Sequence, residues 1–81
     1  MDTIKIYYEI SGIIKIKLSC RQGETNIKRN TTIEDFITTK CGIKKKYLKY
    51  LDVTINGEHK SYTYKLNNND KILILMPIGG G

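Results

Sequence analysis

The stretch KILILMPIGGG, Lys71–Gly81, begins with the most hydrophobic segment of this 81-residue chain and ends in three glycines. An apolar run of this length predicts a strand covered on both faces, or a strand with one face covered and the other used for binding. Because Pro77 has no backbone N–H, we expect regular strand pairing to stop near it. Glycine holds an ordered end in place worse than any other residue. Gly79–Gly81 are therefore either a frayed end or a tail that another molecule needs free of side chains.

The alternation of side chains along this strand predicts that it has two different faces. The set expected to face a helix is Ile72, Ile74 and Met76, and the opposite set is Lys71, Leu73 and Leu75. Two exposed leucines beside the tail, together with Lys71, would make a docking patch for a protein partner. The alternative is that other parts of the sheet, or the N-terminal segment, cover these leucines.

The clearest helix lies upstream, in RNTTIEDFITTKCGI, residues 29–43. Thr32 can cap it, with Asp35 three residues later as a capping-box partner. Three apolar side chains recur at helical spacing and share one face: Ile33, Phe36 and Ile37. Gly42 follows where a C-terminal glycine would end the helix. A helix of two to three turns is marginal alone, so we expect it to pack on a sheet.

Two strands are predicted before the helix, because Ile4–Ile10 and Ile13–Cys20 are rich in β-forming residues and are separated by Ser-Gly. A second turn is predicted at Arg21–Gly23, followed by a weaker strand over Glu24–Lys28. The N-terminal third of the chain thus forms either three strands or two long strands joined by an irregular link.

A further strand is predicted at Leu51–Ile55, where apolar and polar residues alternate before an Asn56-Gly57 turn. Ser61–Leu66 is a candidate short strand, and Asn67–Asp70 is polar turn material. Since strands outnumber the helix, we expect an α+β fold, with a mixed sheet of four to five strands packed on one main helix.

The composition indicates one globular domain over residues 1–81, with a flexible glycine tail at residues 77–81. A hydrophobic fraction of 40% and a charged fraction of 27% argue against disorder. No apolar run approaches the ~20 residues of a membrane span. The charges spaced along the first ten residues do not fit a signal peptide. We therefore expect a cytoplasmic protein that is a monomer alone and has no membrane partner.

Cysteine, histidine and carboxylate residues, which form catalytic and metal sites in many proteins, show no recognisable site pattern in this sequence. Cys20 and Cys41 match no zinc spacing, and the lone His59 gives them no partner set. We interpret both cysteines as structural, and we expect no metal site. One histidine and scattered carboxylates make no catalytic constellation, so we do not expect an enzyme.

The net charge of +6 is concentrated around Lys44–Lys46, where Tyr47 and Tyr50 interleave with the lysines. Such a stretch can bind RNA through phosphate contacts and stacking. The interpretation we prefer is a solvated helix end and loop, which makes nucleic acid an unexpected partner. An acidic surface on a protein partner would use the same charge.

Taken together, the N-terminal strands, TTIEDFI, VTING and NNDKILILMPIGGG resemble the β-grasp sulfur carriers of thiamine and molybdopterin synthesis, the ThiS/MoaD type. The resemblance covers the chain from about Ile13 to Gly81, and it leaves open whether Ile4–Ile10 is the family's first strand or an added one. It implies a ubiquitin-like fold. It also implies that the C-terminal carboxylate is the working group.

By this resemblance, an activating enzyme that holds ATP and magnesium would adenylate the carboxylate of Gly81. A sulfur donor, a cysteine desulfurase or similar protein, would convert the adenylate to a thiocarboxylate for a downstream synthase. Gly80 and Gly81 would be the residues threaded into the partner, with Gly79, Ile78 and Pro77 as the rest of the tail. The chain itself would bind no cofactor and would serve as a protein cosubstrate. Conjugation of the glycine to lysines of target proteins is the alternative, and the sequence does not choose between thiamine, molybdopterin and tRNA thiolation.

Overall fold

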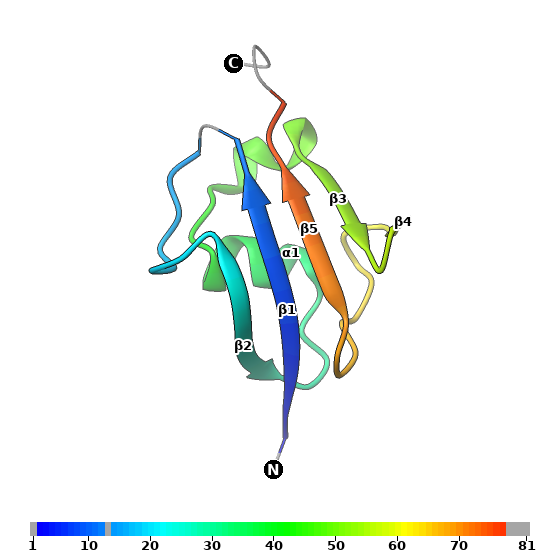
Figure 1. The fold of residues 1–81 in the computed structure, drawn as a ribbon. Coiled ribbons are helices and arrows are strands. Elements are labelled where there is room, and N and C mark those ends of the chain that lie inside the picture. The colour runs from blue at the N-terminus through cyan, green and yellow to red at the C-terminus, as the bar shows by residue number, and fades with distance from the viewer. Residues whose placement is uncertain (1, 13, 78–81) are drawn as a thin grey trace.

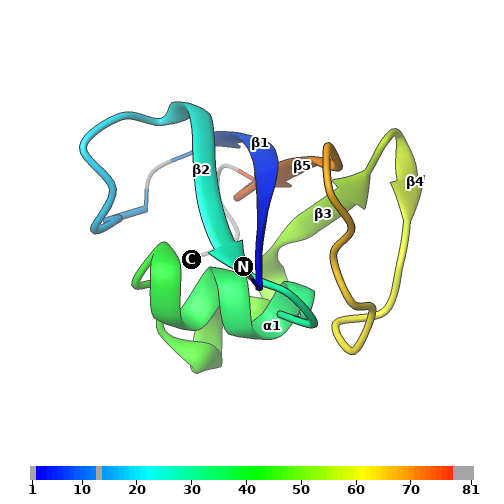
Figure 2. The same cartoon turned by 90° about the horizontal axis from the view of Figure 1, so that it is seen from below.

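The computed structural model describes residues 2–12 and 14–77, and over these residues a five-stranded sheet packs against one helical segment (Figures 1 and 2). The strands are β1 Thr3–Ser11, β2 Gln22–Lys28, β3 Asp52–Ile55, β4 Glu58–His59 and β5 Lys71–Leu75. The helical segments are α1 Ile33–Asp35, its continuation η1 Phe36–Lys40, and the 3₁₀ segment η2 Lys45–Tyr50. Figure 2 shows the helix on one side of the sheet, with the strands arching over it.

The strand order is β2-β1-β5-β3-β4, with β1 and β5 parallel and the other neighbours antiparallel. This arrangement confirms the expected α+β fold with a mixed sheet around one helix. The segment Ile4–Ile10, whose place was open, lies in β1 and pairs with both β2 and β5. Ile4–Ile10 is therefore the first strand of the β-grasp fold and not an added strand. The resemblance to that fold accordingly starts before Ile13.

The core fills the space between the inner face of the sheet and the helix. Every second residue of β1 points into it, as the alternating burial of that strand shows. The side chains that meet there are Ile4, Ile6, Tyr8 and Ile10 of β1, Val53 and Ile55 of β3, Ile72 and Ile74 of β5, and Ile33, Phe36 and Ile37 of the helix. Each fully buried side chain of this size stabilises the fold by roughly 1.5–3 kcal/mol. Burial of this apolar surface sets where the helix lies.

The helix begins and ends as its sequence predicts. The Thr32 side chain accepts a hydrogen bond from the Asp35 N–H at 3.1 Å. The second half widens into a π-helical turn, in which the Cys41 N–H donates to the Phe36 carbonyl at 3.0 Å. Gly42 follows with φ +73°, a left-handed conformation that suits glycine at a helix end. The predicted length of two to three turns is confirmed by the eight residues from Ile33 to Lys40.

The predicted strand over Ile13–Cys20 and its Ser-Gly hairpin are wrong, and the alternative of two strands with an irregular link is correct. After Gly12 the chain leaves the sheet, and β2 covers Gln22–Lys28, including part of the predicted second turn. The link lies over the end of the helix, where the Lys17 N–H donates to the Cys41 carbonyl at 2.8 Å. Its alternation does report burial, because three of its apolar side chains are half-buried against the core: Ile14, Ile16 and Leu18.

Of the strands and turns predicted between Leu51 and Leu75, all but one strand are confirmed. β3 matches the predicted strand, and Asn56 and Gly57 both have positive φ, as a type I′ hairpin turn requires. Ser61–Leu66 forms no strand: its one ladder contact is an isolated bridge between Lys65 and Thr32. The short β4 lies just before it instead. Within the described residues, no helix has the length and apolar composition that crossing a bilayer requires.

Candidate functional site

The candidate site is the C-terminal end of β5, where the chain leaves the sheet at the upper edge in Figure 1. The Met76 N–H donates to the Ser11 carbonyl at 2.9 Å, continuing the β1–β5 pairing one residue beyond the strand. Pro77, the last residue that the structure describes, is exposed and has no N–H to donate to the sheet. The expected working residues Gly80 and Gly81, with Ile78 and Gly79, lie outside the described residues. The described part of the site is therefore the base from which the tail starts.

The side chains of β5 alternate between the core and the outer face of the sheet as predicted. Ile72 and Ile74 are fully buried, whereas Leu73 and Leu75 are half-buried on the outer face. The leucines are less exposed than expected because β5 is a central strand. The residues beside them in the pairing are Glu9 and Thr54 for Leu73, and Ser11 and Asp52 for Leu75.

The third residue of the predicted docking patch lies apart from the tail. Lys71 is exposed at the start of β5, opposite Tyr7 of β1. Leu75 lies four residues further along the strand, which is about 13 Å along the sheet. Lys71, Leu73 and Leu75 thus form one row on the outer face, but only the leucines lie beside the base of the tail.

A hydrogen-bonded side-chain pair next to Leu75 is not predicted by the sequence. The His59 Nε2 lies 2.6 Å from the Asp52 Oδ1. The pair joins β3 to β4 on the outer face of the sheet, because Asp52 is paired with Leu75 in the β3–β5 register. The sequence shows a lone histidine, and its partner becomes visible only when the hairpin register is known.

Gly12 and Met76 are in close contact on the other side of the tail base, and sequence reasoning treated Gly12 only as a turn residue. Gly12 has φ +112°, and a Cβ at this position would lie 2.5 Å from the Met76 carbonyl oxygen. Met76 itself is half-buried and faces the same side as Ile72 and Ile74. A glycine is thus required where β1 ends, because the backbone of the tail base passes directly against it.

The lysine-rich stretch lies in and just before η2, and its charges are exposed as the preferred interpretation expects. Lys45 Nζ lies 3.5 Å from the Glu34 carboxylate, and Lys46 Nζ lies 5.4 Å from the centre of the Tyr47 ring. Tyr47 itself is half-buried against the core, so its ring is not a free platform for a base. Tyr50 is the exposed aromatic of the stretch, with 45% of its surface accessible.

The two cysteines lie in opposite environments. Cys41 is completely buried beneath the helix end, and burial raises the pKa of its thiol to about 12. A neutral thiol in the core behaves as a small hydrophobic side chain. Cys20 is exposed in the link between β1 and β2. In residues 2–12 and 14–77, no three His, Cys, Asp or Glu side chains gather as a metal site would require.

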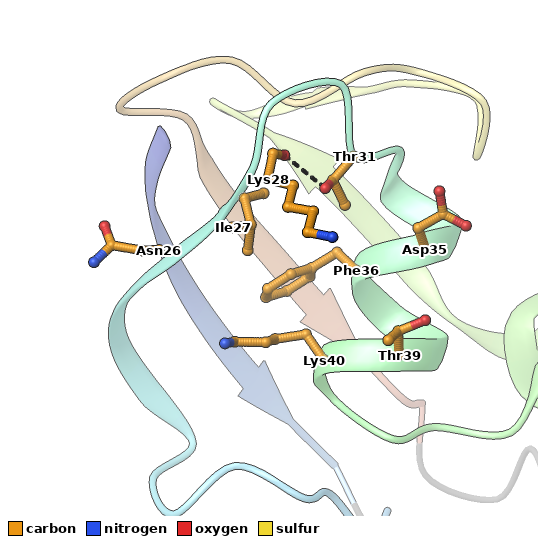
Figure 3. Close-up of a pocket in the computed structure, with 8 residues that line it drawn as sticks. All are labelled: Asn26, Ile27, Lys28, Thr31, Asp35, Phe36, Thr39 and Lys40. Atoms are coloured by element: carbon orange, nitrogen blue, oxygen red, sulfur yellow. Dashed lines mark hydrogen bonds between the residues drawn. The ribbon is translucent and has the colours of Figure 1, made fainter. Parts of the chain in front are cut away.

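A shallow hollow of about 350 Å³ lies far from the tail base, between β2 and the helix (Figure 3). Its lining residues are Asn26, Ile27, Lys28, Thr31, Asp35, Phe36, Thr39 and Lys40. The Phe36 ring and Ile27 form its floor, and both are buried. Its rim is closed on one side by a hydrogen bond from the Thr31 hydroxyl to the Lys28 carbonyl at 2.6 Å. The hollow holds no cluster of groups that could perform acid–base or nucleophilic chemistry.

Two solved structures of small archaeal modifier protein 1 from Haloferax volcanii have the same fold as this chain. One aligns with a TM-score of 0.66 at 10% identity, over 93% of this chain and 99% of that protein. The other aligns with a TM-score of 0.65 at 12% identity, over 95% of this chain and 99% of that protein. No family model matches the chain, and no curated protein sequence matches it either. The fold is the ubiquitin-like β-grasp, and identities this low show the fold alone.

Proposed function

We propose that this chain is a ubiquitin-like protein cosubstrate whose C-terminal glycine carboxylate is activated by a partner enzyme. The observation that carries this proposal is the end of β5. A central strand of a ubiquitin-like sheet ends at Met76, and Pro77 and Ile78 then lead into Gly79–Gly81. Because the fold holds this strand in place, the glycine tail starts from a fixed point on the surface.

The chemistry explains why a partner is needed. A carboxylate is a poor electrophile, and adenylation by ATP supplies a leaving group while releasing pyrophosphate. The partner has to hold ATP, magnesium and the glycine together, because positioning provides much of the rate. Gly80 and Gly81 let a backbone enter a narrow channel, since they carry no side chain. The terminal sulfur of a persulfide on a donor such as a cysteine desulfurase would then attack the acyl-adenylate and displace AMP, giving an acyl disulfide. A thiol would reduce the S–S bond of this disulfide and release the thiocarboxylate, which a downstream synthase would use.

The finer role we propose is sulfur carriage for thiamine, molybdopterin or tRNA thiolation. The second candidate is conjugation of Gly81 to lysines of target proteins. The name of the two structural neighbours, a modifier protein, favours this second candidate. Both roles use the same activated carboxylate and the same cytoplasmic setting, and both fit a protein that is not itself an enzyme.

One experiment tests the shared step, and a second separates the two roles. Adding one alanine after Gly81 should leave the fold intact, because the base of the tail ends at Pro77, and should abolish chain-dependent ATP–pyrophosphate exchange by the host's activating enzyme. Unchanged exchange would refute activation at Gly81. Intact mass of the chain isolated from its host should show oxygen replaced by sulfur if it is a carrier. Immunoblots of host proteins should instead show ladders of conjugates if it is a modifier.

The outer-face leucines are the docking surface we propose for this enzyme. Leu73→Asp or Leu75→Asp should raise the KM for the chain about tenfold or more, since a central apolar contact is worth 2 kcal/mol or more in an interface, by order of magnitude. Thr3→Asp on the same face at the far end of β1 is the matched control, and it should leave KM unchanged. A folded Leu75→Asp protein with normal KM would refute this surface.

A further inference from the structure

A second hollow, distinct from the outer-face leucines, lies against the base of the tail on the helix side of the sheet. Its volume is about 470 Å³, and its lining residues are Ile14, Lys15, Gly42, Ile43, Lys44, Tyr47 and Met76. A neighbouring open hollow of about 550 Å³ shares Ile14 and Lys15 with it and adds Gly12 and Arg21. Met76 lines this hollow and directly precedes Pro77. A partner protein that accepts the tail would therefore lie beside the hollow.

The walls of the hollow are fixed by hydrogen bonds and by close packing. The Arg21 guanidinium donates to the carbonyls of Gly12 at 3.2 Å and Ile14 at 2.7 Å, which holds the start of the β1–β2 link. The Lys17 side chain packs so closely over Gly42 that a Cβ there would clash with its stem. The opposite wall is the start of η2, where the Tyr47 N–H donates to the Lys44 carbonyl at 2.9 Å. The hollow is therefore already formed in the free protein.

The floor of the hollow is apolar and its charge is entirely positive. Ile43 is buried, and Ile14, Tyr47 and Met76 are half-buried. The charged lining residues are Lys15 and Lys44, and both are exposed. Among the described residues, no carboxylate lies within 4.0 Å of either ammonium group. The Glu34 carboxylate is paired with the neighbouring Lys45 instead.

We infer that this hollow receives an apolar side chain flanked by carboxylates, carried by the activating enzyme that takes the tail. The inference rests on the proposed function, and it names a second contact surface for the same partner. An apolar floor favours a protein side chain, whereas a phosphate would leave Ile14, Ile43 and Met76 without a matching contact. The exposed ammonium groups of Lys15 and Lys44, which have no carboxylate partner among the described residues, supply the complementary charge for the flanking carboxylates. The tail base would then be held from both sides, by this basic hollow and by the outer-face leucines.

The test uses charge reversal with a control of equal charge. Lys15→Glu/Lys44→Glu changes the hollow, and Lys28→Glu/Lys65→Glu makes the same change in net charge at exposed lysines elsewhere. With the host's activating enzyme, we expect the first pair to raise the KM for the chain at least tenfold with kcat within twofold. The control pair should change KM less than threefold. Circular dichroism and urea unfolding should show both proteins folded.

The outcomes separate this inference from the proposed function. If the unmodified chain supports no exchange with the enzyme, the proposed function fails. If it supports exchange and the two double variants have equal KM values, the proposed function stands and the basic hollow is not a docking site. Restoration of KM by replacing one acidic residue of the enzyme with lysine, in the charge-reversed pair, would support the inference directly.

A binding experiment tests the chemistry of the hollow without the enzyme. An acetylated hexapeptide of alternating aspartate and leucine should shift the amide resonances of Ile14, Lys15, Lys44 and Met76 in the full chain, and the Lys15→Glu/Lys44→Glu protein should not respond. A leucine-free aspartate peptide that produces equal shifts would overturn the role of the apolar floor. An oligouridylate that displaces the hexapeptide at lower concentration would overturn the choice of a protein partner in favour of RNA.

Discussion

The two ends of β5 are built in opposite ways. At its start, the strand is held by a dense set of hydrogen bonds centred on Asp70. At its end, the last strand-like hydrogen bond within the described residues is the one from Met76 to Ser11, and Pro77, which follows, has no N–H to donate. A small domain can thus be rigid and still present a chain end to a partner. One end of the strand fixes its register, and the other end is left open.

The clamped end depends on one buried carboxylate. Asp70 is 6% exposed, and its side chain accepts hydrogen bonds from the Asn56 amide at 2.9 Å and the Asn67 N–H at 2.8 Å. The Asn56 side chain in turn accepts from the Lys71 N–H at 2.9 Å. The Asp70 carbonyl also accepts from the Tyr7 N–H at 2.9 Å, which ties β5 to β1. The register of β5 against both of its neighbours is thus set here.

The largest effect we expect comes from breaking this clamp. Asp70→Ala removes the carboxylate and leaves the Asn67 N–H and the Asn56 amide without a hydrogen-bond acceptor. We expect the free energy of unfolding to fall by about 3 kcal/mol. Urea unfolding followed by circular dichroism measures the loss. Asp52→Ala, at the exposed Asp52–His59 hydrogen bond beside the open end, is the matched control and should lower the free energy of unfolding by less than about 1 kcal/mol, the usual worth of an exposed polar pair. Equal losses for the two variants would mean that the clamp does not distinguish the ends.

A smaller effect should come from filling the contact at the open end. Gly12→Ala puts a Cβ against the Met76 backbone at φ +112°, whereas Gly57→Ala has a similar φ of +87° and nothing within 4 Å. In both variants the alanine has to adopt a backbone conformation with positive φ, which should lower the free energy of unfolding by about 1–2 kcal/mol. Gly12→Ala should cost roughly a further 1–3 kcal/mol, because Met76 has to move.

The measurement for this pair is urea unfolding combined with amide chemical shifts. In the Gly12→Ala protein, the resonances of Ser11 and Met76 should move while those of Asn67 and Asp70 stay in place. If the shifts spread to Asp70, the two ends of the strand are coupled and the contrast between them is weaker than the structure indicates.

The smallest effect concerns the core beneath the open end, where Cys41 is buried. Because burial raises the pKa of its thiol from 9.0 to about 12, the native state keeps the proton while the unfolded state loses it. Stability should therefore be fully present below pH 9 and fall by roughly 1 kcal/mol per pH unit above it, as proton linkage requires. Unfolding measured from pH 8 to 10 in a Cys20→Ser background gives the slope.

The matched control for this measurement is Cys20→Ser/Cys41→Ala. Lysine and tyrosine groups titrate in the same pH range in both proteins, so only the difference between the two slopes reports on Cys41. Equal slopes in the two proteins would mean that solvent reaches the Cys41 thiol in the native state. The core beneath the C-terminal end of β5 would then be accessible to water.

The elements that the sequence predicts correctly are those governed by local chemistry. Thr32 and Gly42 mark the helix ends through hydrogen bonding and φ, and Asn56-Gly57 marks the hairpin turn. The alternation along β5 correctly separates the buried isoleucines from the half-buried leucines. Each of these signals involves residues close together in the chain, so no knowledge of the tertiary structure is needed.

The predictions that fail depend on the tertiary neighbours of a segment. The alternating link at residues 14–18 has the pattern of a strand, but it packs against the helix end instead of pairing with the sheet. The same is true of the candidate site. The Gly12–Met76 contact, the His59–Asp52 pair and the basic hollow all join segments that are separate in the sequence. The Gly12–Met76 contact could have been found only by assuming the parallel pairing of β1 with β5, which places Ser11 opposite Leu75.

That parallel pairing also has a consequence for how the chain acquires its structure. Of the five described strands, β1 comes first in the sequence and its central neighbour β5 comes last, with Tyr7 pairing to Lys71. Contacts so distant in sequence are slow to form, because the intervening chain has to be closed before they stabilise anything. During synthesis one edge of β1 therefore lacks its hydrogen-bond partner until β5 has been made, and a chain interrupted before β5 has no central strand to complete the sheet. We therefore expect a chain that stops before β5 to leave β1 and β3 without the strand that joins them, and so to be much less stable than the full sheet.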